Sequence, residues 1–108
     1  MYRKGDIVLI PFPFTDLSGS KVRPAIVLHS TSQSTDIVVI FITSQTVKRS
    51  QFQVEIEPTK ENGIKLPSMI LCNKIATLGI NIVLGELGTS GTKIVKSIDD
   101  ELRKVLAL

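Results

Sequence analysis

The sequence predicts a mainly β protein of the α+β class, in which a small β-barrel is followed by one C-terminal α-helix. Clusters of Val and Ile, separated by Gly, Pro, Ser and Asp, recur along the chain until its last dozen positions. Several short strands at this spacing are typical of a small barrel. The apolar spacing then changes to that of a helix. The 108 residues suffice for one core, so we expect a single domain over residues 1–108.

Six strands are expected from the β-branched runs and the turn residues that flank them. They span Ile7–Pro11, Ala25–His29, Ile37–Ile42, Phe52–Ile56, Ser68–Leu78 and Asn81–Leu87. The polar segments 15–22 and 43–50 are the loops best placed to carry function, because loops present side chains from a rigid scaffold. The segment 58–67 contains two prolines and a glycine, which predicts a turn-rich connection.

The C-terminal helix is expected to begin near Ser97. Ser97 and Asp100 have the spacing of a capping box, with Asp in place of the usual Glu or Gln. After this point Ile98, Leu102, Val105 and Leu106 fall on one face of a helix. We expect that face to pack on the barrel as ordinary core, and a groove for a partner is the alternative.

The composition excludes several classes of protein. No apolar run approaches the ~18 residues that a membrane span needs, and the basic N-terminus is not followed by a cleavage site, so a cytoplasmic protein is expected. One cysteine and one histidine permit neither an internal disulfide nor a Cys/His metal site. We therefore expect no metal and no cofactor, and we expect Cys72 to pack as a small hydrophobe.

The positive charge is concentrated in the first half of the chain. Residues 1–50 hold six basic and three acidic side chains, whereas residues 51–108 hold seven of each sign. The formal net charge of +3 therefore comes from the first half. This distribution favours an anionic partner.

One strand begins and the next one ends with residues suited to hold a phosphodiester. Arg23 precedes the apolar run 25–28, and Thr43 and Ser44 end the run 37–42. A guanidinium presents a planar fork of donors that matches phosphate. The alternatives are a surface Arg23 paired with Asp16 or Asp36, and hydroxyls that only terminate a strand.

Six short motifs, in register over nearly the whole chain, resemble the MazF/PemK family of toxins from type II toxin-antitoxin systems. The motifs are Gly5–Val8, Arg23–Leu28, Ile42–Gln45, Val54–Ile56, Ser68–Leu71 and Gly85–Leu87. The resemblance implies an SH3-like barrel of the CcdB/PemK kind, a homodimer, and cleavage of single-stranded RNA (mRNA) without a metal, which inhibits translation and growth. It also implies a cognate antitoxin that inhibits the toxin with an acidic, disordered segment.

Carried over to this chain, the resemblance makes Arg23 the catalytic arginine and Thr43 the catalytic threonine. Attack by the ribose 2′-hydroxyl on the adjacent phosphorus would leave a 2′,3′-cyclic phosphate, and Arg23 suits the role of acid and charge stabiliser better than that of base. The candidate RNA-binding residues are hydroxyl, amide and basic side chains: Ser18, Lys21, Ser44, Gln45, Lys48, Arg49, Ser68, Asn73 and Lys74.

Two segments depart from the family pattern. Residues 17–21 read Leu-Ser-Gly-Ser-Lys where many members have Gly-Ser-Glu-Gln, and residues 73–77 read Asn-Lys-Ile-Ala-Thr in place of Glu-Gln-Ile-Arg-Thr. The base preference and the level of activity therefore stay open. Lys74 either compensates for a lost cation or is simply solvated.

Two other functions remain as alternatives. A CcdB-like toxin would bind gyrase and perform no chemistry, although the Trp-Gly-Ile ending typical of such inhibitors is replaced here by Val-Leu-Ala-Leu. A catalytically silent RNA-binding module of the same fold would account for the altered segment 73–76.

Overall fold

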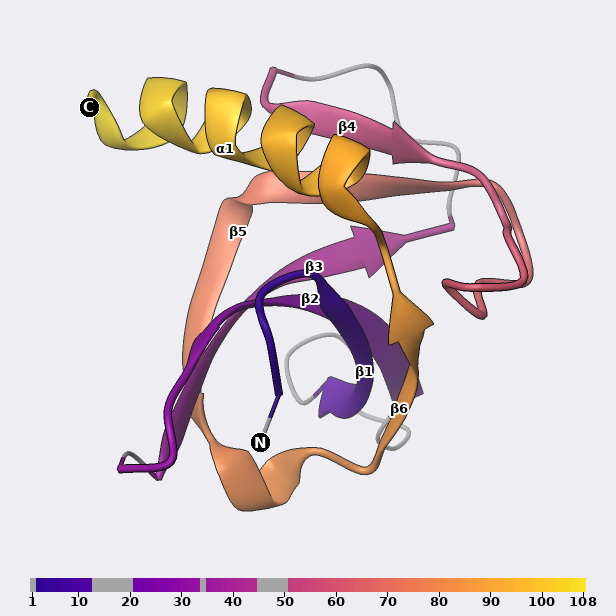
Figure 1. Cartoon of the computed structure of the whole chain (residues 1–108), viewed down its shortest axis with the longest axis vertical. Coiled ribbons are helices and arrows are strands. Elements are labelled where there is room, and N and C mark those ends of the chain that lie inside the picture. Colours follow the sequence, from indigo (N-terminus) through magenta and orange to yellow (C-terminus); the bar gives the residue numbers. More distant parts are fainter. Residues whose placement is uncertain (1, 13–20, 34, 45–50) are drawn as a thin grey trace.

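The computed structural model describes residues 2–12, 21–33, 35–44 and 51–108 (Figure 1). The strands are β1 (Asp6–Phe12), β2 (Lys21–Ser30), β3 (Asp36–Thr43), β4 (Gln53–Ile56), β5 (Ser68–Gly79) and β6 (Gly85–Thr89). They form one antiparallel sheet in the order β4-β5-β3-β2-β1-β6. The sheet curls into a half-barrel, and α1 (Thr92–Leu106) lies across β4 and β5 (Figure 1). The predicted mainly β barrel with a C-terminal helix is confirmed.

The last predicted strand, Asn81–Leu87, is wrong in its first half. Residues Ile80–Ile82 form a short 3₁₀ helix, η1, and only Gly85–Thr89 pairs with β1 as β6. The apolar side chains of Ile80, Ile82 and Val83 all pack against one core cluster. The run is therefore apolar because a compact, partly buried turn packs against the core there, and not because it alternates across a sheet.

The helix begins five residues before the predicted cap. Gly91 is the N-cap residue with φ +87°, no side chain caps the helix, and Ser97 lies in its interior. Ile98 is buried and Leu102 packs beside it, as the spacing predicted, but Leu106 is 53% exposed and does not belong to the core. Among the described residues, no helix is long and apolar enough to cross a membrane.

The sheet buries a different core on each face. Ile7, Ile26, Ile40 and their neighbours pack with Ile98 of α1, and we call this cluster the helix-side core. The adjacent residues along each strand form a second core: Val8, Ile10, Ala25, Val27, Ile37 and Val39. Successive side chains of a strand point to opposite faces of the sheet. If one residue packs in a given core, the residue next to it in the strand therefore faces the other side.

Strand β5 contributes to both cores because it bends in its middle (Figure 1). Phe41 of β3 pairs with Leu71, whereas the preceding Ile40 pairs with Ile75. Residues 72–74 of β5 therefore bulge out between two consecutive pairs. Before the bulge β5 packs in the helix-side core, and after it Ala76 packs against the second core.

The connection between β4 and β5 is held by the buried side chain of Asn62. Its Oδ1 accepts hydrogen bonds from the backbone N–H groups of Thr59 (3.0 Å) and Ile64 (2.9 Å), and its Nδ2 donates to the carbonyl of Glu57 (2.9 Å). The Thr59 hydroxyl in turn accepts from the backbone N–H of Asn62 (3.0 Å). One amide thus satisfies three backbone groups of the connection.

The same connection packs directly on β6. The backbone N–H of Thr89 donates to the carbonyl of Glu61 (2.9 Å), and a Cβ atom at Gly88 would overlap that carbonyl oxygen. Gly63 has φ +68°, and its ideal Cβ position lies 2.5 Å from the carbonyl oxygen of Leu87. The two glycines therefore let two backbones approach closely.

We expect the Gly88→Ala substitution to destabilise the protein by about 1–3 kcal/mol, because the new methyl group must displace the backbone at Glu61. Gly85→Ala, in the same strand, is the matched control. No atom lies within 4 Å of its Cβ position, so its effect should stay within about 0.5 kcal/mol. Urea unfolding of both variants measures the difference, and equal stabilities would contradict the close approach.

We expect Asn62→Ala to cost about 1–3 kcal/mol, because the N–H groups of Thr59 and Ile64 would lose their acceptor. The exposed Asn81 provides a control, since Asn81→Ala removes the same amide without a buried partner. Thermal unfolding compares the two. A stable Asn62→Ala variant would show that the amide does not hold the connection.

Candidate functional site

Arg23 and Thr43 lie on the same face and at the same end of the sheet. Arg23 pairs with Ile10 of β1, whose side chain belongs to the second core. Strands β2 and β3 pair up to Ala25 and Phe41, and Arg23 and Thr43 each lie two residues beyond this pair on the same face. The two predicted catalytic residues are therefore at the same end of the sheet.

The environment of Arg23 holds its side chain in place. The residue is half-buried and its Nε atom is buried, and the hydroxyl-bearing Thr43 is only 8% exposed. Asp36, one of the alternative partners of Arg23, pairs with Gly79 at the opposite end of β3. At ~3.3 Å per residue that end is about 20 Å away, which excludes an ion pair between Arg23 and Asp36. The other alternative partner, Asp16, lies outside the described residues.

Ser44 and Ser68 lie at the same strand ends, and both line a groove on the opposite face. Ser68 pairs with Ile56, and its neighbour Ile70 belongs to the helix-side core. The Ser68 hydroxyl donates to the carbonyl of Leu66 (2.7 Å), so its first role is to shape the preceding connection. The strand ends thus carry polar candidates on both faces.

The groove that Ser44 and Ser68 line has a volume of about 290 Å³. Its apolar floor comes from four different parts of the chain: Leu9, Pro24, Ile64 and Leu87. Among the described residues that line the groove, Lys65 carries the single charged side chain, and Leu66 lies next to it. Pro24 and Ser44 directly follow Arg23 and Thr43 in sequence, so the groove lies at the same end of the sheet but on the face opposite the two predicted catalytic residues.

Sequence reasoning missed the contribution of the β4–β5 connection to this groove. The segment was interpreted only as turn-rich, yet it provides Lys65 and Leu66, both exposed. The Asn62-Gly63 dipeptide was the available signal, because Asn-Gly marks a turn that needs a positive φ. No sequence pattern, however, indicates that this turn packs on β6 and faces the ends of β2 and β3.

Of the remaining RNA-binding candidates, three lie among the described residues and four do not. Asn73 and Lys74 are exposed in the bulge of β5, beside the pair formed by Phe41 and Leu71. Lys21 begins β2, opposite Phe12. The other four candidates lie outside the described residues: Ser18, Gln45, Lys48 and Arg49.

Cys72 is fully buried next to the bulge, as expected for a small hydrophobe. Burial, and to a smaller extent the negative charge of Glu101, raises the pKa of this thiol to about 11. The thiol is therefore neutral near pH 7 and does not act as a nucleophile. In the described part of the chain, no group of three or more His, Cys, Asp or Glu side chains could hold a metal ion.

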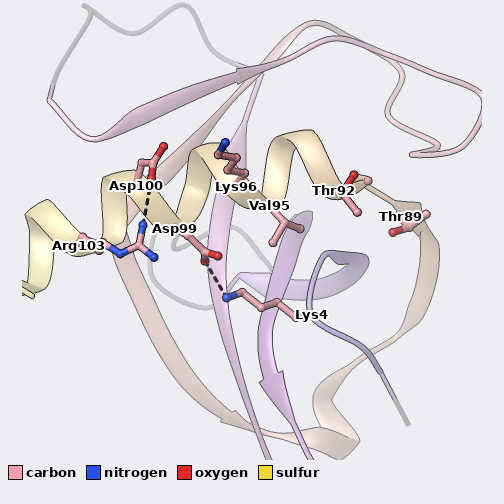
Figure 2. A pocket seen from close by; sticks show the side chains of 9 residues that line it. Lys4, Thr89, Thr92, Val95, Lys96, Asp99, Asp100 and Arg103 are labelled. Atoms are coloured by element: carbon pink, nitrogen blue, oxygen red, sulfur yellow. Dashed lines mark hydrogen bonds and ion pairs between the residues drawn. The ribbon is translucent and has the colours of Figure 1, made fainter.

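A second cavity of about 490 Å³ lies beside α1 (Figure 2). Lys4 reaches it from the N-terminal segment and forms an ion pair with Asp99 (2.7 Å), and Arg103 pairs with Asp100 (3.1 Å). Lys96 is the third cation that lines the cavity, and Figure 2 shows it on the helix itself. Carboxylates therefore balance two of the three cations among the described residues that line this cavity.

The chain is similar to known proteins over nearly its whole length. A family profile described as PemK-like, MazF-like toxin of type II toxin-antitoxin systems matches residues 3–106. No curated protein matches the sequence significantly.

Solved structures share the fold at low sequence identity. An endoribonuclease in complex with its cognate antitoxin, from a Mycobacterial species, is 17% identical with a TM-score of 0.80, covering 100% of this chain and 97% of its own. The Mycobacterium tuberculosis toxin MazF-mt6 is 19% identical with a TM-score of 0.78, covering 95% and 97%. MazF from Deinococcus radiodurans is 18% identical with a TM-score of 0.78, covering 99% and 97%.

The match to the family profile spans almost every residue of the chain, and the half-barrel with its C-terminal helix agrees with the solved structures. The resemblance found in the six sequence motifs is thereby confirmed. The chain belongs to the PemK-like, MazF-like toxins of type II toxin-antitoxin systems.

Proposed function

We propose that this toxin is a metal-independent, sequence-selective endoribonuclease that cuts single-stranded RNA. Membership of the toxin family supports this proposal, and two of the structural neighbours are themselves described as endoribonucleases. The observation that supports it is that Arg23 and Thr43 each lie two residues beyond the pair Ala25–Phe41, on the same face of the sheet. Cleavage of mRNA by such an activity would stop translation and growth.

The proposed chemistry uses the RNA's own nucleophile. The ribose 2′-oxygen forms a bond to the adjacent phosphorus, the bond from phosphorus to the 5′-oxygen breaks, and the 2′-hydroxyl proton is released while the leaving oxygen gains one. The products are a 2′,3′-cyclic phosphate and a 5′-hydroxyl. DNA lacks the 2′-hydroxyl and is not a substrate.

Arg23 stabilises the negative charge that develops on the phosphoryl oxygens. Its guanidinium remains protonated at neutral pH and offers donors in a fixed plane, and the buried Nε reduces the freedom of the side chain. Donors that are already oriented need no reorganisation during the reaction. The Thr43 hydroxyl, at the end of the neighbouring strand, contributes one further donor to the same phosphoryl group.

We propose that the inhibitor is a small antitoxin protein with an acidic segment that is disordered before it binds. The excess positive charge of residues 1–50 attracts such a segment, and folding on binding lets a short chain cover a long surface. One structural neighbour was solved in complex with its cognate antitoxin, and two others are MazE-MazF structures from Deinococcus radiodurans.

A catalytically silent RNA-binding module is the second candidate function. The observation that favours it is the bulge of β5, where exposed Asn73 and Lys74 replace the acidic and amide residues of many relatives. Such a module would bind single-stranded RNA with the same surface and leave it intact. The experiment below distinguishes the two, since it measures cleavage and binding separately.

We expect Arg23→Ala to slow RNA cleavage by a factor on the order of 100–1000, which corresponds to the loss of one oriented donor in the transition state. Thr43→Ala should slow cleavage less, because water can partly replace one hydroxyl. End-mapping of a mixed single-stranded RNA in EDTA measures both rates and detects the 2′,3′-cyclic phosphate.

Arg103→Ala is the matched control for Arg23→Ala, because Arg103 is exposed on α1. Circular dichroism and RNA binding establish that each variant is folded. The assignment of the site is wrong if Arg23→Ala cuts as fast as the parent protein. A requirement for a divalent metal would equally overturn it, whereas binding without any cleavage would favour the silent module.

We expect the protein to be a homodimer. One half-barrel of 11.8 kDa offers little concave surface, and two-fold pairing creates a long groove from small subunits. Light scattering at micromolar concentration should give about twice the mass of the chain. A protein that stays monomeric under these conditions contradicts the expectation.

A further inference from the structure

The connection between β4 and β5 contains an Asn-Gly dipeptide, in which an asparagine readily loses its side-chain amide. The chain holds three asparagines, and only Asn62 precedes a glycine, since a lysine follows Asn73 and an isoleucine follows Asn81. The loss begins when the backbone nitrogen of the next residue attacks the side-chain carbonyl carbon. A following glycine has no side chain to hinder this attack and has the freest backbone. In an unfolded chain, Asn62 is therefore the asparagine that reacts first.

The folded connection holds both reacting groups in hydrogen bonds. The nucleophile is the backbone nitrogen of Gly63, and its N–H donates to the carbonyl of Thr59 (3.2 Å). The Oδ1 atom of Asn62 accepts from the backbone N–H groups of Thr59 (3.0 Å) and Ile64 (2.9 Å). Its Nδ2 atom donates to the carbonyl of Glu57 (2.9 Å). Because Asn62 is only 2% exposed, the attack would break hydrogen bonds that water does not replace.

We propose that Asn62 is a site of spontaneous deamidation, which the folded connection prevents and which proceeds when the connection opens. Opening separates the connection from β6, beside which it lies (Figure 1). Native proteins open locally in this way with free energies below that of global unfolding. The reaction belongs to the chain itself and does not depend on the proposed cleavage of RNA.

The reaction has two steps and needs only water. The backbone nitrogen of Gly63 forms a bond to Cγ of Asn62, the bond from Cγ to Nδ2 breaks, and the proton of the Gly63 N–H passes to the leaving nitrogen, which departs as ammonia. Water then adds to either carbonyl carbon of the resulting succinimide ring and opens it. Addition at Cγ leaves an aspartate. Addition at the backbone carbonyl carbon leaves an isoaspartate, whose main chain is longer by one methylene.

Either product weakens the packing of the connection on β6. An aspartate loses the donor to the Glu57 carbonyl and places a negative charge at a buried position. An isoaspartate lengthens the backbone directly before Gly63, which has φ +68° and an ideal Cβ position 2.5 Å from the Leu87 carbonyl oxygen. Because refolding does not restore the amide, a connection that has reacted stays weakened.

The first test follows the three asparagines by peptide mapping and mass spectrometry at mildly alkaline pH, in native buffer and in urea that unfolds the protein. Asn62 should remain an amide in native buffer and become aspartate and isoaspartate in urea. Asn73 and Asn81 are internal controls, because they are exposed in the folded protein and should change little in either condition. Equal rates at Asn62 in both conditions would overturn the inference. A rate in urea no faster than at Asn73 and Asn81 would overturn it as well.

The second test raises the opened population without altering the asparagine. Gly88→Ala disturbs the contact of β6 with the Glu61 backbone, so it should accelerate deamidation of Asn62 in native buffer about 5- to 30-fold, in proportion to the opened population. Gly85→Ala is the matched control and should leave the rate unchanged, because no atom lies within 4 Å of its Cβ position. An unchanged rate in the Gly88→Ala variant contradicts reaction through opening.

The parent protein supplies the same series if Gly88→Ala does not fold. Its rate of deamidation should rise with urea concentration below the unfolding midpoint, because urea increases the opened population. A rate that does not depend on urea in this range contradicts the inference.

The third test examines the product. Asn62→Asp reproduces the aspartate and should unfold at a lower urea concentration than the parent protein. Asn81→Asp makes the same change at an exposed position and should unfold at the parent's concentration. Equal unfolding midpoints for the two variants would show that deamidation does not weaken the connection, and would overturn that part of the inference.

Discussion

The close packing of the β4–β5 connection on β6 is the constraint on which the rest of the structure depends. Strand β4 and strand β6 are the two edges of the sheet, so this contact joins opposite edges and closes the curl of the half-barrel. It requires a residue without a side chain at Gly88, because a methyl group there would overlap the Glu61 carbonyl. A hydrogen bond from Thr89 then covers part of an edge that would otherwise expose unpaired backbone groups.

The curled sheet determines which side chains lie together at the ends of β2, β3 and β5. Because β2 begins where β3 ends and β5 begins, Arg23, Thr43 and Ser68 gather at one end. The pleat then separates them, with Arg23 and Thr43 on the face of the second core and Ser68 toward the helix-side core. The anchored connection before β5 adds Lys65 at the groove. A cation and a hydroxyl thus lie on one face of the sheet at this end, and the apolar groove lies on the other face.

The bulge of β5 links the altered sequence of this toxin to its architecture. Residues 72–74 are extra relative to β3, and they allow one strand to leave the helix-side core and enter the second core. Cys72 occupies the buried position of the bulge, whereas Asn73 and Lys74 point to solvent. Of the departures from the family pattern in residues 73–77, Asn73 and Lys74 therefore fall on exposed positions of the bend, whereas Ala76 packs against the second core.

Much of the fold was determined by the sequence alone, because alternation of apolar residues and turn residues is local information. The runs 7–11, 25–29, 37–42 and 68–78 became strands, and the motifs identified the family. Local rules failed at two places: the run at Ile80 forms a partly buried turn that packs on the core, and α1 starts at Thr92 without a side-chain cap. Only the tertiary structure decided that Arg23 faces away from Ser68 and that Lys65 borders the groove. These relations depend on strand register and on contacts between distant segments, which arise when the sheet closes.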